Sequence, residues 1–467
     1  MSPVASPEVQ PSSAVNESHF LNSADARQLN DLSSNGYRES GELEPDEACD
    51  GDVQMVSNDR VSWLTRACSK LILNRLKQLK SGQLVIQLGC DQAVFGQLDE
   101  GQVPAIIQVH SETFFKRLVF GGGVAAAESY MDAEWSSPDL TAVFRVLLQN
   151  ESVLESFRPS SFSPFRWIQR IGYFLNRNSK DGSRKNIHEH YDLGNAFFSL
   201  FLDESMMYSS AIFNSADCSL LDASWEKVDR VCRSLELSAD DHVIEIGTGW
   251  GGFAVHAAGK YGCRVTTTTI SEEQYLYAKK RIAEAGLEDR VTLLKSDYRD
   301  LTGQYDKLVS LEMIEAVGRQ YLPGYFSTCN RLLKPGGAMM IQAITMADQR
   351  FESYSRGVDF IQKYIFPGGF LPSITEMQKC VGDQTDLRMV QLDDFGMDYA
   401  KTLQHWNMRF HAKLDEVREQ GFSEQFIRMW RYYLTYCEAA FLERSTGLVQ
   451  AKWVKPDCQH GRHVLSN

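Results

Sequence analysis

A turn crowded with glycine limits the folds open to this chain. Residues 242–253 read HVIEIGTGWGGF, with four glycines in six positions directly behind an apolar run. The run predicts a buried strand, and the following GFAVHAAGKYG has the spacing of a helix. Glycine lets a ligand approach the main chain closely, and the first turn of a helix offers free N–H groups. The stretch therefore predicts a ligand site between a strand and a helix.

Strand and helix patterns alternate along the chain from about residue 240. Further strands are expected in RVTTTTI, VTLLKSD, YDKLVSLEM and AMMIQAIT, and SEEQYLYAKKRIAEAG reads as a helix capped by Ser271, with Gln274 three residues later. Such alternation builds a mostly parallel sheet with helices on both faces, and ligands lie beyond the carboxyl ends of its strands. We therefore expect an α/β domain over residues 187–467.

The glycine pattern also bears on the kind of ligand. A dinucleotide fingerprint would read GxGxxG, with an acidic residue about 20 positions later. This chain has GTGWGG instead, and its second predicted strand ends in TTTTIS, without an acid. The sequence thus favours an adenosyl ligand that lacks a pyrophosphate. A purely structural glycine turn remains the alternative.

The N-terminal part differs from the rest in composition. The first 60 residues hold twelve acidic residues against three arginines, so we expect residues 1–59 to be a disordered acidic tail. Residues 60–155 have helical spacing in SKLILNRLKQLKSG, SETFFKRLVFGG, AAAESYMDAEW and LTAVFRVLLQN, and short strands in QLVIQLG, AVFGQL and PAIIQVH. This pattern predicts a small α+β domain.

A basic and aromatic segment joins the two predicted domains. Between residues 156 and 186, arginines and lysines alternate with Phe165, Trp167, Tyr173 and other apolar side chains. On a helix these residues would form one cationic and one aromatic face, as in segments that lie on anionic lipid. Two readings stay open: a linker helix packed on its neighbour, and a membrane-docking segment.

Cysteine usage and hydropathy indicate the compartment. The ten cysteines include no CxxC pair, which argues against a zinc site or a disulfide framework and favours a reducing environment. No signal peptide is recognisable, and no run approaches the roughly 18 apolar residues of a membrane span. We expect a cytoplasmic protein that binds no structural metal.

Longer motifs point to a family. VIEIGTGWGGFAV, TTTTISEEQ, LLKSDYRDL, YDKLVSLEMIEAVG and NRLLKPGG occur in the order typical of S-adenosylmethionine-dependent methyltransferases. HYDLGNAFFSLFLDESMMYSSAIF before the glycine turn, with DFIQKYIFPGGFLPS, DDFGMDYAKTLQHW and FIRMWRYYLTYCEAAF after it, resembles the cyclopropane-fatty-acyl-phospholipid synthase family over roughly 185–455. The resemblance implies a class I methyltransferase Rossmann-like sheet with helical lipid-binding insertions, preceded by a small lipid-associated domain.

The resemblance also implies a reaction and a cofactor site. A methyl group of S-adenosylmethionine would pass to a cis double bond of a phospholipid acyl chain, and loss of a proton from the new methyl would close a cyclopropane ring. Matching the family's pattern, the cofactor would be bound by Tyr208, Ser209, Gly247, Thr248, Gly249, Trp250, Gly251, Thr269, Ile270, Ser271, Gln274, Asp297 and Tyr298. Glu245 is expected to support the turn from behind.

For the base, the family resemblance implies a bicarbonate ion. Its expected partners here are Ser210, Glu315, Gln342, the main chain of Ile344, and Tyr399. Two of these positions depart from the family pattern, because Ser210 replaces a cysteine and Gln342 replaces a histidine. Both can still form hydrogen bonds to an oxyanion. Cys437 matches a cysteine once proposed as catalytic, although a buried thiol is the simpler reading.

An apolar tunnel is required because drawing about eight methylenes of a lipid into water would cost roughly 6 kcal/mol. The aromatic residues of NAFFSLF, KYIFPGGF and MWRYYL are candidate walls, with ordinary core packing as the alternative for each. Other functions remain open: a methyl- or methylene-branched product, N-methylation of a small amine, or a catalytically silent lipid-binding module.

The same resemblance defines the expected partners. These are a membrane phospholipid with an unsaturated acyl chain, an anionic membrane surface and a second copy of the chain in a homodimer. Nucleic acid is not among them. We therefore expect a peripheral protein on the inner face of a membrane.

Overall fold

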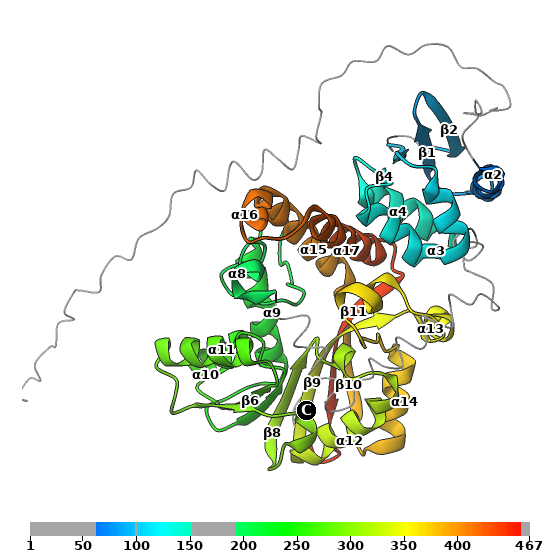
Figure 1. Cartoon of the computed structure of the whole chain (residues 1–467). Helices are drawn as coiled ribbons and strands as arrows, with labels where there is room; N and C mark the ends of the chain where they lie inside the picture. Colours follow the sequence, from blue (N-terminus) through cyan, green and yellow to red (C-terminus); the bar gives the residue numbers. More distant parts are fainter. Residues whose placement is uncertain (1–61, 99–100, 102, 152, 154–192, 459–467) are drawn as a thin grey trace, which may run out of the picture. The chain divides into compact units, whose positions relative to one another are not determined.

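The computed structural model describes residues 62–98, 101, 103–151, 153 and 193–458 (Figure 1). The expected acidic tail over 1–59 and the basic and aromatic segment over 156–186 lie outside the described residues. The predictions made for those two segments therefore remain predictions.

The main sheet has seven strands in the order β10-β11-β9-β8-β5-β6-β7 (Figure 1). Adjacent pairs among β5 to β9 are parallel, whereas β11 is antiparallel to both β9 and β10. The strands are β5 (His242–Ile246), β6 (Arg264–Thr269), β7 (Val291–Lys295), β8 (Tyr305–Leu311), β9 (Leu333–Met346), β10 (Arg388–Asp394) and β11 (Thr446–Val454). The predicted α/β class is confirmed, and its five parallel strands are those read from the sequence.

Helices cover both faces of this sheet, so successive side chains of a strand pack against helices on opposite faces. Val243 belongs to the apolar cluster formed with α9 and α10, while Ile244 belongs to the cluster formed with α12 and α14. Burial on both faces explains why β5 reads as a nearly continuous apolar run. The helices are α9 (Leu220–Ser234), α10 (Gly252–Tyr261), α11 (Glu272–Glu284), α12 (Leu322–Leu332) and α14 (Ile374–Gln384).

Strand order reverses between β5 and β8. From β5 the chain proceeds outward through β6 and β7, then returns to place β8 on the other side of β5. Crevices at such reversals are the usual ligand sites of parallel sheets. The glycine turn is fixed there, because the N–H groups of Gly247 and Thr248 donate to the carbonyl of Thr268, at 3.1 and 3.0 Å.

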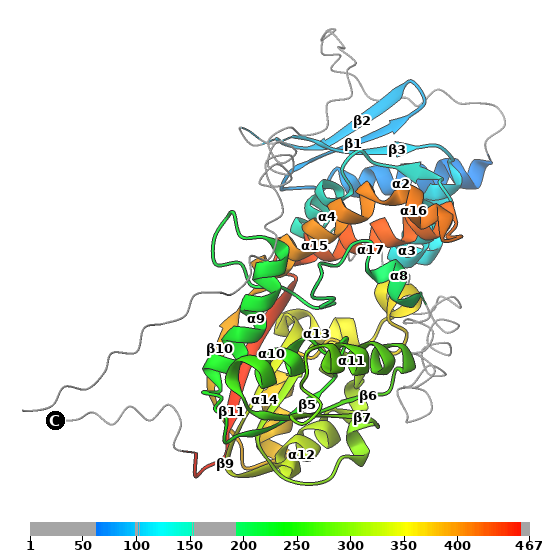
Figure 2. The same ribbon diagram turned by 90° about the vertical axis from the view of Figure 1, so that its left-hand side faces the viewer.

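A second group of helices is inserted around the carboxyl edge of the sheet. Its longest members, α15 (Gly396–Ala412) and α17 (Glu424–Leu442), lie side by side in both views (Figures 1 and 2). The other members are α8 (Gly194–Phe198), α13 (Asp348–Ser355), α16 (Leu414–Glu419), the π-helix η4 (Ile361–Ile365) and the 3₁₀ turns η1 (Tyr298–Asp300), η2 (Ile314–Ala316) and η3 (Arg319–Tyr321).

The small domain has a four-stranded sheet in the order β2-β1-β3-β4. Its elements are α2 (Trp63–Leu76), β1 (Gln83–Leu88), β2 (Asp91–Gly96), β3 (Ala105–Val109), α3 (Thr113–Met131), β4 (Trp135–Ser136) and α4 (Leu140–Gln149). Three of these strands were predicted. The two helical segments expected on either side of residue 123 form one kinked helix, since Gly122 has a φ of 62° inside α3.

Helix α17 joins the small domain to the inserted helices. Arg428 donates to the main-chain carbonyls of Tyr130 and Trp135, and Thr141 donates to the Glu438 carboxylate at 3.1 Å. Phe144 and Tyr432 pack edge to face, with their ring centroids 4.8 Å apart. The core of the small domain is therefore continuous with that of the inserted helices.

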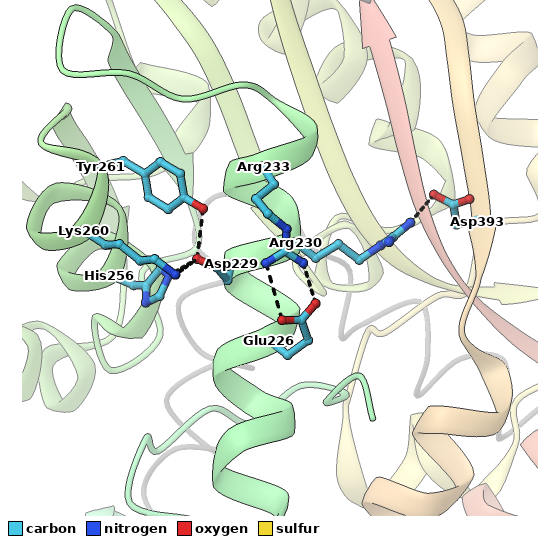
Figure 3. Close-up of polar contacts among 8 residues, drawn as sticks. All are labelled: Glu226, Asp229, Arg230, Arg233, His256, Lys260, Tyr261 and Asp393. Atoms are coloured by element: carbon cyan, nitrogen blue, oxygen red, sulfur yellow. Dashed lines mark hydrogen bonds and ion pairs between the residues drawn. The ribbon is translucent and has the colours of Figure 1, made fainter. Parts of the chain in front are cut away.

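A polar cluster on α9 holds that helix in place (Figure 3). The Asp229 carboxylate accepts hydrogen bonds from His256, Lys260 and Tyr261 of α10, at 2.8, 2.7 and 2.9 Å. Arg230, the next residue, pairs with Asp393 of β10 at 2.8 Å (Figure 3). Because α10 begins at the glycine turn, these contacts fix α9 relative to the proposed ligand site.

We expect Asp229→Asn to lower the unfolding temperature by a few degrees at pH 7. Burial acts to raise the pKa of Asp229, but hydrogen bonds from Lys260, His256 and Tyr261 outweigh it and hold the pKa below its usual range. A depressed carboxyl pKa stabilises the fold above the unfolded value, near 3.9, and this contribution is lost as pH falls through the folded value. The difference in unfolding temperature between wild type and Asp229→Asn should therefore become smaller only in acid, below about pH 4.

Thermal unfolding followed by circular dichroism between pH 7 and pH 3.5 measures this effect. Asp240→Asn is the control, since Asp240 is an exposed acid near the start of β5. Equal unfolding temperatures for wild type and Asp229→Asn at pH 7 would contradict the assigned role.

Candidate active site

A cavity of about 710 Å³ lies at the carboxyl edge of the main sheet and extends into the small domain. This volume falls within the range of about 300–1,000 Å³ typical of small-molecule sites. Its walls come from the turns after β5, β6, β7 and β8, from the inserted helices, and from the small domain. The small domain contributes Glu151, which pairs with Arg350, and otherwise mainly apolar residues, among them Ile72, Leu76, Leu84, Ile86, Ile107, Phe114, Phe115, Leu118, Trp135, Val143, Phe144 and Leu147.

The glycines of the turn serve different purposes. Gly247 and Gly249 line the cavity with φ values of 103° and 53°, which disfavour any other residue. A Cβ on Gly251 would lie 3.2 Å from the Cβ of Ala278, and one on Gly252 would lie 2.7 Å from the Cε of Met207. Close helix packing therefore explains Gly251 as well as any ligand does.

Most residues predicted to bind the cofactor line this cavity. They are Tyr208, Ser209, Gly247, Thr248, Gly249, Trp250, Thr269, Ile270, Gln274, Asp297 and Tyr298. Gly251 and Ser271 are not among the lining residues. The Ser271 hydroxyl instead caps α11 by accepting from the N–H of Gln274 at 3.3 Å, so its role in the cavity is indirect.

A buried network supports the glycine turn from the side of the sheet. Thr267 donates to the Glu245 carboxylate at 2.6 Å and shares a hydrogen bond of 2.6 Å with the Thr248 hydroxyl. Burial raises the pKa of Glu245 to about 8. Glu245 therefore supports the turn through Thr267, as the sequence suggested, and its carboxyl also reaches the cavity wall.

Several side chains that line the cavity are held by hydrogen bonds to neighbouring segments. The Trp250 indole donates to Asn195 at 2.6 Å, and the hydroxyls of Tyr208 and Tyr433 are 2.9 Å apart. The Asp297 carboxylate accepts from both the main chain and the guanidinium of Arg299. These contacts hold the rings and the carboxylate in place before any ligand binds.

Lys227 is a cavity residue that sequence reasoning missed. Its ammonium lies in the wall, 1% exposed, and donates to the hydroxyl of Ser209. Burial lowers its pKa to about 8, against the opposing charges of Glu312, Asp203 and Glu245. In the sequence it stands on an amphipathic helix, where a lysine normally reads as a solvent-exposed residue.

Glu312 is the second residue that was missed, and it accepts hydrogen bonds from three of the expected bicarbonate partners. The main-chain N–H of Ser210 and the amide of Gln342 donate to Oε1 at 2.9 and 2.7 Å, and the Tyr399 hydroxyl donates to Oε2 at 2.9 Å. Glu312 lies directly after β8 and lines the cavity.

Glu315 lines the same cavity, three residues further on. Its Oε1 accepts from the N–H of Ile344 at 2.5 Å, whereas its buried Oε2 has no hydrogen-bond partner among the described residues. Burial, together with the charge of Glu312, raises the pKa of Glu315 to about 8. The two carboxyls are therefore held in different environments, with most donors on Glu312.

These contacts do not fit a bicarbonate ion held as expected. Ser210 and Gln342 are fully buried and do not line the cavity. The Gln342 amide is engaged by Glu312, by the carbonyl of Ser210 and by Gln450, and the Ser210 hydroxyl donates to the carbonyl of Ala211. Only the unpartnered Oε2 of Glu315 points to an additional hydrogen-bonding group.

Two further expectations concern the reactivity of the Cys437 thiol and the aromatic walls of the expected tunnel. Cys437 lines the cavity, but burial raises the pKa of its thiol well above the usual range, so the thiol stays protonated. Phe366 and Phe370 of KYIFPGGF and Tyr432 and Tyr433 of MWRYYL line the cavity. The phenylalanines of NAFFSLF do not, and they pack in the core around Trp430 instead, so for them the core reading holds.

Replacing Gly247 by Ala should weaken binding of S-adenosylhomocysteine at least tenfold. A Cβ there would lie 3.2 Å from Met313 and a φ of 103° disfavours any side chain, so the turn must shift to accept alanine and its main chain would leave the position that suits the cofactor. Gly382→Ala is the control, because a Cβ there meets nothing within 4 Å and lies on α14. Calorimetric titration measures the S-adenosylhomocysteine affinity of both variants. Unchanged affinity for Gly247→Ala would show that the glycine turn does not bind the cofactor.

Comparison with known proteins agrees with this geometry. Residues 178–451 match the model of the mycolic acid cyclopropane synthetase family. The chain is 38% identical to a tuberculostearic acid methyltransferase of Mycobacterium tuberculosis, over 80% of this chain and 89% of the relative. It is also 38% identical to a cyclopropane-fatty-acyl-phospholipid synthase of Escherichia coli K12, over 75% of this chain and 88% of the relative.

Solved structures show the same fold. The cyclopropane synthase MmaA2 of Mycobacterium tuberculosis superimposes with a TM-score of 0.55 and 25% identity, over 58% of this chain and 98% of that one. The mycolic acid cyclopropane synthase CmaA1, solved in complex with SAH and CTAB, gives a TM-score of 0.55 and 28% identity over the same shares. With the family model matching more than half of its length, the chain belongs to the mycolic acid cyclopropane synthetase family of S-adenosylmethionine-dependent methyltransferases.

Proposed function

We propose that this methyltransferase acts on the cis double bond of an acyl chain in a membrane phospholipid and forms a cyclopropane fatty acid. One observation carries the proposal: a single cavity joins the glycine turn, the two half-buried carboxyls of Glu312 and Glu315, and an apolar section. The glycine turn suits the adenosyl cofactor, and the apolar section suits a hydrocarbon chain.

The apolar section offsets the cost of taking a lipid tail out of the bilayer. Each methylene exposed to water costs about 0.8 kcal/mol, so an acyl chain needs protein walls along most of its length. Leu84, Ile107 and Phe115 supply such walls in the small domain, and Phe360, Phe366 and Tyr432 supply them among the inserted segments. We therefore propose that the small domain is lipid-associated because it receives part of the substrate.

The chemistry begins with the alkene. Its π electrons form a bond to the methyl carbon of the sulfonium, the carbon–sulfur bond breaks, and its electron pair stays on sulfur as S-adenosylhomocysteine forms. The positive charge moves to the other alkene carbon. Loss of a proton from the new methyl then leaves a carbon–hydrogen electron pair that closes the three-membered ring.

The chain's own residues meet two needs of this sequence. The faces of Tyr208, Tyr399 and Tyr433 in the wall can stabilise a neighbouring cation, and the apolar lining excludes water that would capture it. The resemblance assigned the proton to bicarbonate, but the expected donors already serve Glu312 and Glu315. The carboxyls themselves are the better-supported acceptors.

A branched product is a second candidate, favoured by the 38% identity to a tuberculostearic acid methyltransferase. After methyl transfer, a hydride can shift from the methylated carbon to its cationic neighbour, and loss of a methyl proton then gives a methylene branch. Both routes start from the same cation and lose one proton from the new methyl, so the same site serves either outcome.

The substrate also requires a membrane. No helix in the described part of the chain is long and apolar enough to cross a bilayer. We propose peripheral docking on an anionic membrane surface on its inner, cytoplasmic face, with residues 156–186 as the contact, because their arginines and aromatic side chains suit lipid headgroups.

Mass spectrometry of lipids from cells that express the protein with methyl-deuterated methionine tests the function. We expect phospholipid acyl chains to gain one methylene carrying two deuterium atoms, since one of three is lost as the proton. Ring proton signals in the NMR spectrum would identify a cyclopropane, and vinylidene signals would identify the methylene branch. Unmodified acyl chains with labelled small amines would contradict both.

Replacing Gly123 by Trp tests the small domain's share of the substrate site. Gly123 lines the cavity from α3, and a Cβ there meets nothing within 4 Å, so the indole can enter the cavity without displacing the core. We expect turnover to fall at least tenfold while S-adenosylhomocysteine affinity is unchanged. Gly324→Trp on α12, which also meets no atom within 4 Å and does not line the cavity, is the control. Equal turnover for wild type and Gly123→Trp would exclude the small domain from the substrate path.

A further inference from the structure

We propose that Glu312 is the proton acceptor of the reaction, a carboxylate of the chain itself in the place where the resemblance implied a bicarbonate ion. The inference rests on the proposed function, because it assumes that a proton leaves the transferred methyl group. It concerns a residue that the sequence did not single out.

The hydrogen bonds around Glu312 are those expected around a bound oxyanion. Donors from three separate elements converge on one carboxylate: Ser210 ahead of α9, Gln342 in β9 and Tyr399 in α15. Oε1 accepts two of these bonds and Oε2 accepts the one from Tyr399. A carboxylate oxygen has two acceptor sites, so Oε2 retains capacity for a proton.

The backbone at Glu312 is strained in a way that aims this side chain. Its φ is 51°, in the left-handed region that costs a non-glycine residue about 1–2 kcal/mol. Such conformations persist where the surroundings over-determine them, and they cluster at functional sites. Here the N–H of Glu312 donates to the carbonyl of Gln342 at 2.8 Å, and the three donors hold the side chain.

Glu312 also lies beside the expected position of the cofactor. The next residue, Met313, packs against Gly247, where a Cβ would come within 3.2 Å of it. Both Glu312 and Gly247 line the cavity, at the adjacent ends of β8 and β5. A methyl group delivered above the glycine turn would therefore be close to this carboxylate.

The neighbouring groups favour an ionised Glu312 and a neutral Glu315. Burial raises the pKa of Glu312, but Lys227 and the bonds from Gln342, Ser210 and Tyr399 oppose that shift. Glu315 has one donor, and burial with the charge of Glu312 raises its pKa to about 8. Paired carboxyls held in unlike environments commonly divide into base and acid. The pKa of Glu312 still lies above its usual value, so its assignment as the base rests on the three donors that converge on its carboxylate.

The proposed step is balanced. A carbon–hydrogen bond of the transferred methyl breaks, its electron pair forms the ring bond to the cationic carbon, and the proton forms a bond to Oε2 of Glu312. The proton passes to solvent after the product leaves. No co-reactant is needed, and in the branched route the same carboxylate accepts the methyl proton after the hydride shift.

Turnover in carbon dioxide-free buffer, with and without added bicarbonate, is the first test. We expect wild-type turnover to be the same in both. Glu312→Gln should lower kcat by about 10²–10⁴-fold, the range for loss of a general base, with S-adenosylhomocysteine affinity within threefold of wild type. The matched control is Glu438→Gln, a buried glutamate that bonds Thr141 and lies outside the cavity, which should keep both quantities.

Binding of ¹³C-bicarbonate, followed by NMR, is the second test and does not depend on activity. We expect no binding to wild type at millimolar concentration, whereas Glu312→Gly should bind the ion and regain part of its turnover when bicarbonate is added. Binding by wild type, or a wild-type rate that requires bicarbonate, would overturn the proposal. An unchanged kcat for Glu312→Gln would overturn it as well. If wild type methylates no lipid, the proposed function fails, and the binding result still decides whether Glu312 takes the place of the ion.

Discussion

Close approach of two strand ends organises this molecule. The turn after β5 and the turn after β8 meet where strand order reverses, and a Cβ on Gly247 would lie 3.2 Å from the side chain of Met313. Hydrogen bonds to Thr268 fix the turn from the other side. A cofactor that binds the bare main chain is thereby brought next to the carboxyls that follow β8. The inserted helices and the small domain line the same cavity, and there they would enclose a substrate.

Electrostatics and apolar burial act together in that enclosure. Two carboxyls, a lysine and several tyrosines lie in the wall of a cavity whose lining is mostly apolar, so each charge depends on its partners. Glu312 has three donors and the nearby charge of Lys227, whereas Glu315 has one donor and a like-charged neighbour. The same dry surroundings that make these groups costly to ionise also protect a carbocation from water. In the proposed function, the apolar section lined by the small domain extends this environment along the lipid tail.

Local patterns in the sequence predicted the parallel sheet well, because β5 to β9 are rich in apolar or β-branched residues and α11 has a recognisable cap. The antiparallel strands β10 and β11 were missed, since no side chain of β10 is fully buried and β11 mixes polar with apolar residues. Most of the residues that the family motifs named for the cofactor line the cavity, although they make up only a minority of its lining. They could not reveal Glu312 as a hydrogen-bond acceptor, since that depends on a left-handed φ and on Ser210, Gln342 and Tyr399 meeting from distant parts of the chain. Lys227 escaped notice for a similar reason: helical spacing does not tell a buried lysine from an exposed one.

The central claim is that cofactor and lipid meet in one cavity, under the glycine turn and beside Glu312. A crystal structure with S-adenosylhomocysteine and a phospholipid carrying a cis double bond tests it most directly. We expect the alkene carbons between the cofactor sulfur and the Glu312 carboxylate, with the distal part of the acyl chain inside the small domain. An acyl chain bound elsewhere, or a cavity closed by the protein's own side chains when the cofactor is bound, would contradict it.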